Sequence, residues 1–92
     1  MNAKVTEIQI IPVKPRDGLV GFASFVYDDL FYLSSIGIYT RPSGGYRLTY
    51  PIRKVGESNF SIFHPINNET GKFIENLIGE RYEEIIADSL TG

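Results

Sequence analysis

The spacing of apolar residues changes once along this chain, close to residue 66, and this change constrains the fold more than any other feature. Before it, short β-branched or aromatic segments alternate with turn residues, which predicts β-strands. After it, apolar residues recur at the i, i+3, i+4 spacing of one helical face. These residues are Phe73, Ile74, Leu77, Ile78, Tyr82, Ile85 and Ile86. The sequence therefore predicts an α+β protein that closes with an α-helix.

Four strands are expected in the first part of the chain, over residues 5–13, 19–27, 30–40 and 46–50. The segments between them are short and rich in Pro, Asp, Ser and Gly, which are turn residues. Because no connection could hold a helix, neighbouring strands should pair antiparallel as a meander. A polar loop over 53–59 is expected to lead to a fifth strand or extended arm over 60–63. The predicted sheet thus has four to five strands.

A chain of 92 residues makes one domain, 1–92, with the sheet over about 4–63 and the helix over about 68–88. Asn67, Asn68 and Thr70 are all competent to cap that helix. Pro65 should hold His64 extended, so that Phe63-His64-Pro65 forms a rigid junction between sheet and helix.

The third strand carries large apolar residues of both parities, which predicts a sheet with two apolar faces. Phe31 and Leu33 should lie on one face, and Tyr32, Ile36 and Ile38 on the other. One helix covers only one face, so a second copy of the chain is expected to cover the other in a two-fold homodimer.

Residues that could carry catalysis are few. There is no cysteine and a single histidine, which leaves little for a zinc site or a catalytic triad. The pair Asp28-Asp29 fits a turn better than acid–base work, and His64 fits the junction before the helix. Gly44-Gly45 lacks the frame of a phosphate-binding loop. We expect no enzymatic activity, no cofactor and no metal.

Membrane and export signals are also missing from the sequence. No apolar run reaches the roughly 18 residues that span a membrane. The first twenty residues lack the order of a signal peptide. A cytoplasmic protein without membrane contact is expected.

Charge is distributed unevenly, although the formal net charge is only −2. Residues 41–54 hold four bases and no acid, and tyrosines are interleaved with them; the bases are Arg41, Arg47, Arg53 and Lys54. Cations that meet phosphates beside rings that stack on bases would suit nucleic acid. Strand alternation, however, puts Arg47 and Thr49 on one face and Tyr46, Leu48 and Tyr50 on the other. A solvated sheet face with the tyrosines in the core is therefore the alternative.

Several short motifs follow one another in a distinctive order: Val5 through Gly18, Phe22-Ala23-Ser24, Ile36-Gly37-Ile38, Gly45, Pro51 followed by Arg53-Lys54, His64-Pro65-Ile66-Asn67, and Tyr82 in the helix. The His64-Pro65-Ile66-Asn67 motif is the most specific. This order resembles the SpoVG family of bacterial septation proteins over roughly residues 5–84. The helix departs from the family, because Arg81 is its only base after Lys72 and it ends in EEIIADSLTG.

The resemblance implies a small dimeric domain that binds DNA or RNA as a regulator of septation, sporulation or virulence genes, without enzymatic activity. On this interpretation Arg41, Arg47, Arg53 and Lys54 contact the nucleic acid. The alternative is a protein-interaction module of the division machinery that uses the acidic helix as its partner surface and binds no nucleic acid.

Overall fold

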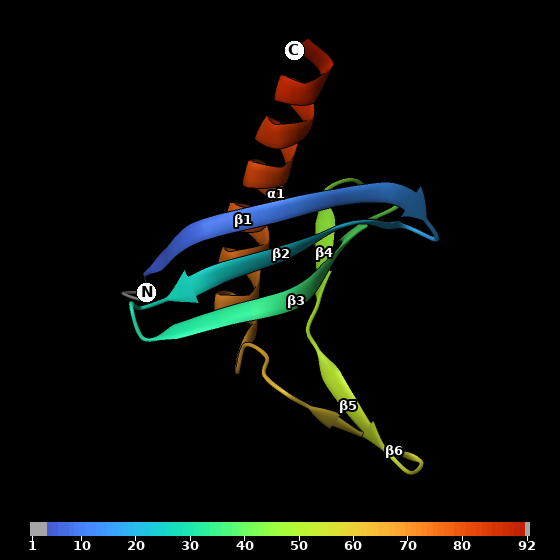
Figure 1. Ribbon diagram of the computed structural model, residues 1–92, viewed down its shortest axis with the longest axis vertical. Coiled ribbons are helices and arrows are strands. Elements are labelled where there is room, and N and C mark those ends of the chain that lie inside the picture. The colour runs from blue at the N-terminus through green and yellow to red at the C-terminus, as the bar shows by residue number, and fades with distance from the viewer. Residues whose placement is uncertain (1–3, 92) are drawn as a thin grey trace.

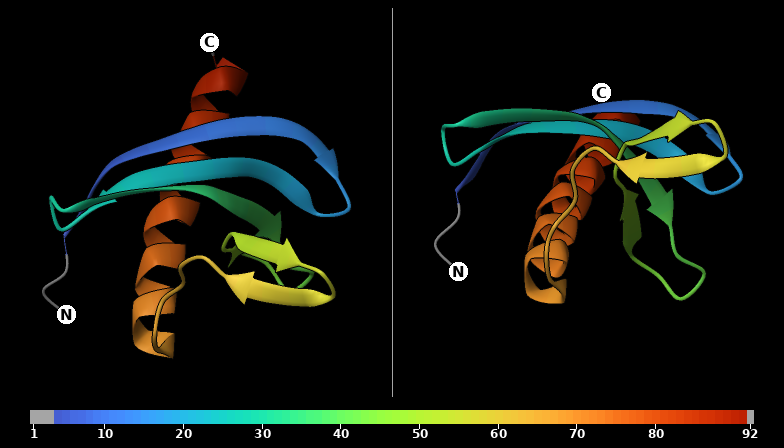
Figure 2. Two further views of the ribbon diagram at one scale, coloured as in Figure 1. Left: turned by 60° about the horizontal axis from the view of Figure 1, so that its bottom comes forward. Right: turned by 90° about the horizontal axis from the view of Figure 1, so that it is seen from below.

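The computed structural model describes residues 4–91 and contains a four-stranded sheet, a separate two-stranded hairpin and one helix. The ends of the predicted domain, residues 1–3 and 92, lie outside the described residues. The elements in chain order are β1 (Val5–Arg16), β2 (Leu19–Tyr27), β3 (Phe31–Thr40), β4 (Tyr46–Thr49), β5 (Ile52–Val55), β6 (Ser58–Ser61) and α1 (Asn68–Thr91). Strands β1 to β4 pair antiparallel in chain order, and α1 crosses one face of their sheet (Figures 1 and 2). The predicted α+β meander with a C-terminal helix is confirmed.

Short polar residues make the first two turns of the meander. Asp17 and Gly18 join β1 to β2 with φ angles of 52° and 88°, the positive values that a type I′ turn requires. Asp28 and Asp29 begin the turn from β2 to β3 with φ angles of 53° and 58°. Asp tolerates this left-handed region better than most residues. The Asp28-Asp29 pair therefore occupies a turn, as the sequence indicates.

Two β-bulges shift the alternation of side chains along the sheet. Glu7 in β1 (φ 52°) and Ser35 in β3 (φ 63°) each lie where their strand has one residue more than β2. An extra residue reverses the alternation that follows it. Leu33, Ile36 and Ile38 consequently all turn toward α1. The prediction that Leu33 lies on the opposite face from Ile36 and Ile38 is wrong for this reason.

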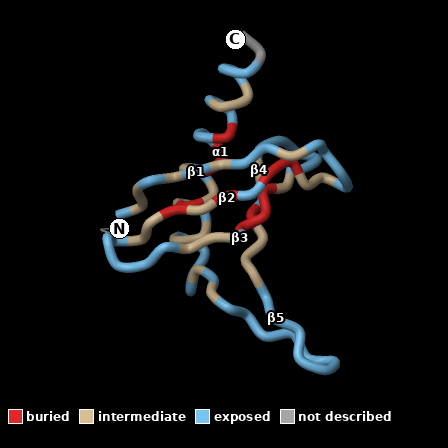
Figure 3. The backbone as a smooth tube through the Cα atoms, in the orientation of Figure 1, coloured by how far each residue is buried: buried red, intermediate tan, exposed pale blue. Residues whose placement is uncertain are grey.

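The core lies between α1 and the face of the sheet that α1 covers, here called the inner face; the other is the outer face. Ile74, Ile78 and Tyr82 are four residues apart on one side of α1 and are buried. They pack against buried residues of β2, β3 and β4 (Figure 3), which are Val20, Ala23, Phe25, Ile36, Ile38 and Leu48. This packing is what holds a helix that contains two glycines.

Helix α1 begins at a capped end. Asn67 Oδ1 accepts a hydrogen bond from the Thr70 backbone N–H at 2.8 Å, so Asn67 is the N-cap among the three predicted candidates. The helix continues to Thr91, past the predicted end near 88. Within residues 4–91, no helix is long and apolar enough to cross a membrane.

Strands β5 and β6 form a hairpin that projects from the body of the protein (Figure 1). We call residues 52–62 the arm. All eight residues of its two strands are exposed, and Gly56 (φ 61°) and Glu57 make its turn. The polar loop predicted over 53–59 is therefore wrong, because most of that segment pairs as a hairpin. The extended-arm interpretation of the next segment agrees with β6.

Candidate nucleic-acid interface

Arg47 stands on the outer face of the sheet. Leu48 is buried, and Tyr46 and Tyr50 pack against the core, so alternation along β4 turns Arg47 to the opposite side. The Arg47 guanidinium carbon lies 4.8 Å from the centroid of the Tyr39 ring, its cross-strand neighbour. This is cation–π geometry, which fixes the direction of the guanidinium while its edge stays free to bind an anion. The predicted division of β4 into two faces is confirmed.

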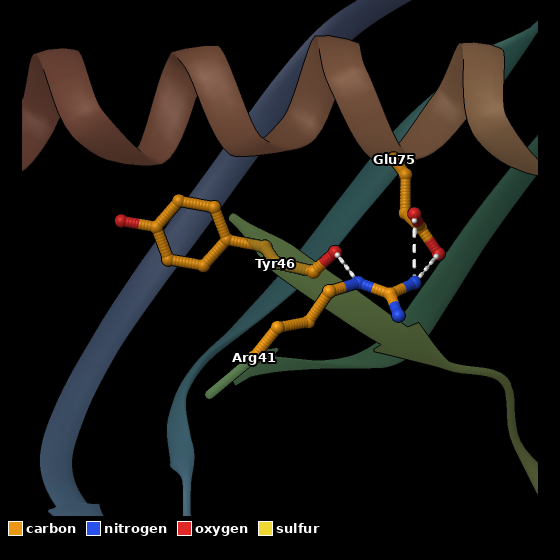
Figure 4. Close-up of polar contacts among 3 residues, drawn as sticks. All are labelled: Arg41, Tyr46 and Glu75. Carbon is orange, nitrogen blue, oxygen red and sulfur yellow. Dashed lines mark hydrogen bonds and ion pairs between the residues drawn. The ribbon is translucent and has the colours of Figure 1, made fainter. Parts of the chain in front are cut away.

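Arg41 turns the other way, toward α1. Its Nε donates to the Tyr46 backbone carbonyl at 3.0 Å, and its Nη2 donates to both carboxylate oxygens of Glu75 at 3.2 Å (Figure 4). Glu75 is the better buried partner, with 25% of its side chain exposed against 42% for Arg41. The charge of Arg41 is thus matched within the protein, and its role here is to tie the start of β4 to the helix.

Arg53 and Lys54 lie on the arm and point to opposite sides of it, because they are consecutive in β5. Arg53 pairs across the hairpin with Phe60, and Lys54 pairs with Asn59. Both side chains are exposed, and neither forms an ion pair within residues 4–91. Each is free to meet a phosphate, but not on the same surface of the arm.

The four bases that are neighbours in the sequence are therefore separated in space. Arg47 is on the outer face, Arg41 is on the helix side, and Arg53 and Lys54 are on the two faces of the arm. The local sequence contains no signal for the Arg41–Glu75 contact, whose partners are 34 residues apart. Strand alternation alone could have separated Arg53 from Lys54.

The two tyrosines of β4 are positioned by burial. Burial raises the pKa of Tyr50 to about 12, with a smaller contribution from the negative charge of Glu75. The Tyr50 hydroxyl is buried and has no hydrogen-bond partner within the described part of the chain. Burial also raises the pKa of Tyr46, which meets Tyr82 edge-to-face at 5.2 Å between centroids. These phenols are core groups, not ligand contacts.

The two candidates for acid–base chemistry lie apart. Asp29 binds Lys4 Nζ at 2.7 Å, and this hydrogen bond, followed by the charge of Asp29, raises the pKa of Lys4. His64 is exposed at the junction before α1, where its Nδ1 lies 2.8 Å from the Pro65 carbonyl oxygen. Neither side chain has a nucleophile beside it, so the arrangement offers no catalytic pair.

The acids of α1 lie on the side of the sheet opposite to Arg47. Glu80, Glu83 and Glu84 are exposed, and Arg81 donates to Glu84 at 3.3 Å. No basic residue occupies the last turn of the helix. The sheet thus separates an acidic helix from the cation on its outer face (Figure 2).

Comparison with known proteins decides the family. Residues 3–84 match the model of the SpoVG family. The chain belongs to the SpoVG family. Relatives named "Putative septation protein SpoVG" include one from Onion yellows phytoplasma (strain OY-M), 33% identical over 90% of this chain and 84% of its own length. Those from Bdellovibrio bacteriovorus and Clostridioides difficile are 35% and 30% identical, and cover 88% and 90% of this chain and 74% and 90% of their own lengths.

The motif that most specifically indicates the SpoVG family is structural in this member. His64 and Pro65 make the extended link from the arm to α1, and Asn67 caps the helix. Ile66 between them is 89% exposed, which makes it the most exposed of the large apolar side chains described. The motif thus positions the helix and leaves one large apolar side chain in solvent.

Proposed function

We propose that this SpoVG-family protein is a cytoplasmic, nucleic-acid-binding regulator that contacts phosphates through the outer face of its sheet and through its arm. The observation that carries this proposal is the placement of Arg47. It is exposed, it is oriented by Tyr39, and it has no acidic partner within residues 4–91. The acids of α1 are on the far side of the sheet, so they do not compete for a bound backbone.

Arg47, Arg53 and Lys54 are the bases available to the backbone. Binding phosphates with Lys and Arg releases counterions, which makes affinity fall as salt rises. Arg41 is the least suited of the predicted four, because Glu75 already neutralises it. The net charge of −2 means that binding relies on the local field of these three residues.

A homodimer is part of the same proposal, and the arm is the surface that supports it. An isolated two-stranded hairpin is marginally stable in water. The arm also exposes Ile52, Val55, Phe60 and Ile62, each by more than half. A two-fold contact between arms would bury these side chains and double the number of cations offered to one nucleic acid.

The biological role that we infer is in septation, the process that the names of the relatives give. Regulation of gene expression would then connect nucleic-acid binding to cell division. That connection is an extension of the family name, and the binding experiment below stands independently of it.

The test is a salt titration of binding to a DNA duplex and to an RNA strand by fluorescence anisotropy. The parent should lose affinity steeply as salt rises, with a slope of about 0.9 per phosphate contacted on duplex DNA. Replacing Arg47, Arg53 and Lys54 together with Ala should weaken binding to all sequences and flatten the slope by about 3. Arg41→Ala is the matched control, and it should leave the slope unchanged.

A parent that binds neither nucleic acid at low salt would overturn the proposal. Equal affinities for the triple variant and the parent would do the same. The alternative is a protein partner for the acidic end of α1, where Glu80, Glu83 and Glu84 are exposed. A partner of that kind would bind the triple variant and the parent equally well.

A further inference from the structure

A groove of about 350 Å³ crosses the outer face between β1, β2 and β3. Phe22 and Tyr32 contribute its rings, Ile11 contributes a further apolar side, and Gln9, Ser24 and Ser34 contribute polar groups. The volume is at the lower end of the range for small-molecule sites. Helix α1 is on the other side of the sheet, so this face is open to a ligand (Figure 2).

The rings in this groove are more exposed than a stable surface requires. Tyr32 is 66% exposed and Phe22 is 41% exposed, although both lie within regular strands. The Tyr32 ring makes no aromatic or cation–π contact within the described residues. Exposed aromatic side chains gathered around a hollow indicate a surface that binds something flat and apolar.

The polar groups of the groove are unoccupied as well. The side chains of Gln9, Ser24 and Ser34 form no hydrogen bond with any other group of residues 4–91. They offer an amide and two hydroxyls, which can both donate and accept. The site therefore matches a planar ring that carries hydrogen-bonding atoms on its edge.

The backbone shapes the hollow. The bulge at Ser35 lies at its floor, and bulges are over-represented next to functional sites. Gly37, opposite Phe22, keeps the neighbouring surface low, because a Cβ there would come within 2.5 Å of Thr49 Oγ1 and 3.2 Å of Tyr39. Phe22 stands about four residues along β2 from the partner of Tyr32, so the two rings are roughly 13 Å apart along the strands.

Cationic charge continues this surface. Tyr39 follows Gly37 on the same face of β3, and Arg47 lies over its ring. From Phe22 to Arg47 is two strands across and two residues along, roughly 12 Å between backbones. A ligand that fills the groove with a ring and presents a phosphate beside it would satisfy both parts of the surface.

We propose that the groove takes unpaired nucleobases, so that the protein binds single-stranded nucleic acid across its outer face by stacking bases on Phe22 and Tyr32. This inference rests on the proposed function and adds the form of nucleic acid that the site accepts. Stacking on aromatic rings tolerates any base, since every base has a π-face. A duplex cannot use the groove, because its bases are already stacked and paired and must be pulled out at a cost of a few kcal/mol each.

The test compares three probes of equal length at one low salt concentration: an oligothymidine strand of about 20 nucleotides, the duplex of that strand with oligoadenine, and a strand of abasic sites with the same phosphates. The parent should bind oligothymidine at least about ten-fold more tightly than the other two, because each stacked base is worth about a factor of ten. The double variant Phe22→Ala, Tyr32→Ala should lose that preference and bind all three probes alike.

Matched variants separate stacking from structure. Phe31→Ala removes an equally exposed ring that adjoins Tyr32 but points to the other side of the sheet, and it should keep the preference. Phe22→Trp should also keep it, and since the chain has no other Trp, its emission should be quenched by oligothymidine and not by the abasic strand. The salt slope of the double variant should equal that of the parent, whereas loss of Arg47 flattens it.

Each remaining outcome is decisive. Salt-dependent binding that depends on Arg47 but ignores Phe22 and Tyr32 would overturn this inference and leave the proposed function standing. No binding to any probe would overturn both. If the double variant instead converts a dimer to a monomer in light scattering, the groove is a contact between copies of this chain, and the inference fails.

Discussion

At the scale of single residues, two glycines of α1 show how one substitution can have opposite effects along a single helix. Each glycine costs a helix roughly 1 kcal/mol relative to alanine. At Gly71 an added Cβ would lie 3.9 Å from the nearest side chain, the Cβ of Pro65, which is ordinary contact. At Gly79 it would lie 3.1 Å from Cδ2 of Tyr46, whose ring is already packed against Tyr82. Gly79 is buried and is the point of closest approach between α1 and β4.

We expect Gly71→Ala to raise the free energy of unfolding by about 0.5–1 kcal/mol. Gly79→Ala should lower it by about 1–3 kcal/mol, since overpacking at Tyr46 outweighs the gain in helix propensity. Urea denaturation of the two variants beside the parent measures both changes. If both substitutions stabilise the protein, the ring of Tyr46 moves freely, and the close packing of α1 on β4 is not what limits position 79.

Tyr50 makes the stability of the protein sensitive to alkaline pH. Its phenol loses a proton near pH 10 in the unfolded chain, but keeps it to about pH 12 in the folded protein. Between these values the unfolded state binds fewer protons, so the free energy of unfolding falls as pH rises. Below about pH 10 both states are protonated and this contribution is constant.

Tyr50→Phe should therefore reduce the loss of stability between pH 10 and 12. At pH 7 it should change stability little, because the hydroxyl has no hydrogen-bond partner to lose within the described residues. Denaturation curves at pH 7, 10, 11 and 12 give the comparison. A variant whose stability falls in parallel with that of the parent would show that Tyr50 is not the group responsible.

At the scale of elements, turn chemistry made most of the meander predictable, and backbone irregularity limited the rest. The range 19–27 predicted for the second strand is that of β2, because Asp17-Gly18 and Asp28-Asp29 mark both its ends. The bulge at Ser35 was not predictable in this way, since a serine with positive φ carries no sequence signal. That one residue reversed the faces assigned to β3 and removed the predicted apolar outer face.

The arm and the bases near it show the same limit. Each strand of the arm is only four residues long and lacks an apolar face, so its sequence is typical of a polar loop. The side assigned to Arg47 followed from alternation and is confirmed, whereas the capture of Arg41 by Glu75 depends on tertiary packing. The groove was missed because Phe22 and Tyr32 belong to different strands, and only the register of the sheet places them on one surface.

At the scale of the whole molecule, the prediction concerns the oligomeric state. A stable dimer should bury at least roughly 1,000 Å² in total, and the arm offers the exposed apolar side chains for such a contact. Light scattering at tens of micromolar should give twice the 10.4-kDa mass of the chain. Replacing Phe60 and Ile62 together with Asp should give the monomer mass, because the arm contact would then bury unpaired charge.

Phe31→Asp is the control, since Phe31 is equally exposed but lies outside the arm. It should leave the mass at that of a dimer. A parent that scatters as a monomer would contradict the prediction outright. A dimer that Phe31→Asp disrupts and the arm variant does not would move the contact to the end of β3.

The order in which the chain supplies its core has a consequence for synthesis on the ribosome. Every strand of the sheet precedes α1 in the chain, yet Ile74, Ile78 and Tyr82 provide the only helical cover that the described residues hold for its inner face. Translation proceeds from the N-terminus, so the meander emerges with Phe25, Ile36 and Ile38 still open to water. The nascent chain must remain unfolded, or be shielded by a chaperone, until residue 82 has left the exit tunnel. Stalling before that residue would therefore release an aggregation-prone sheet rather than a shorter folded protein.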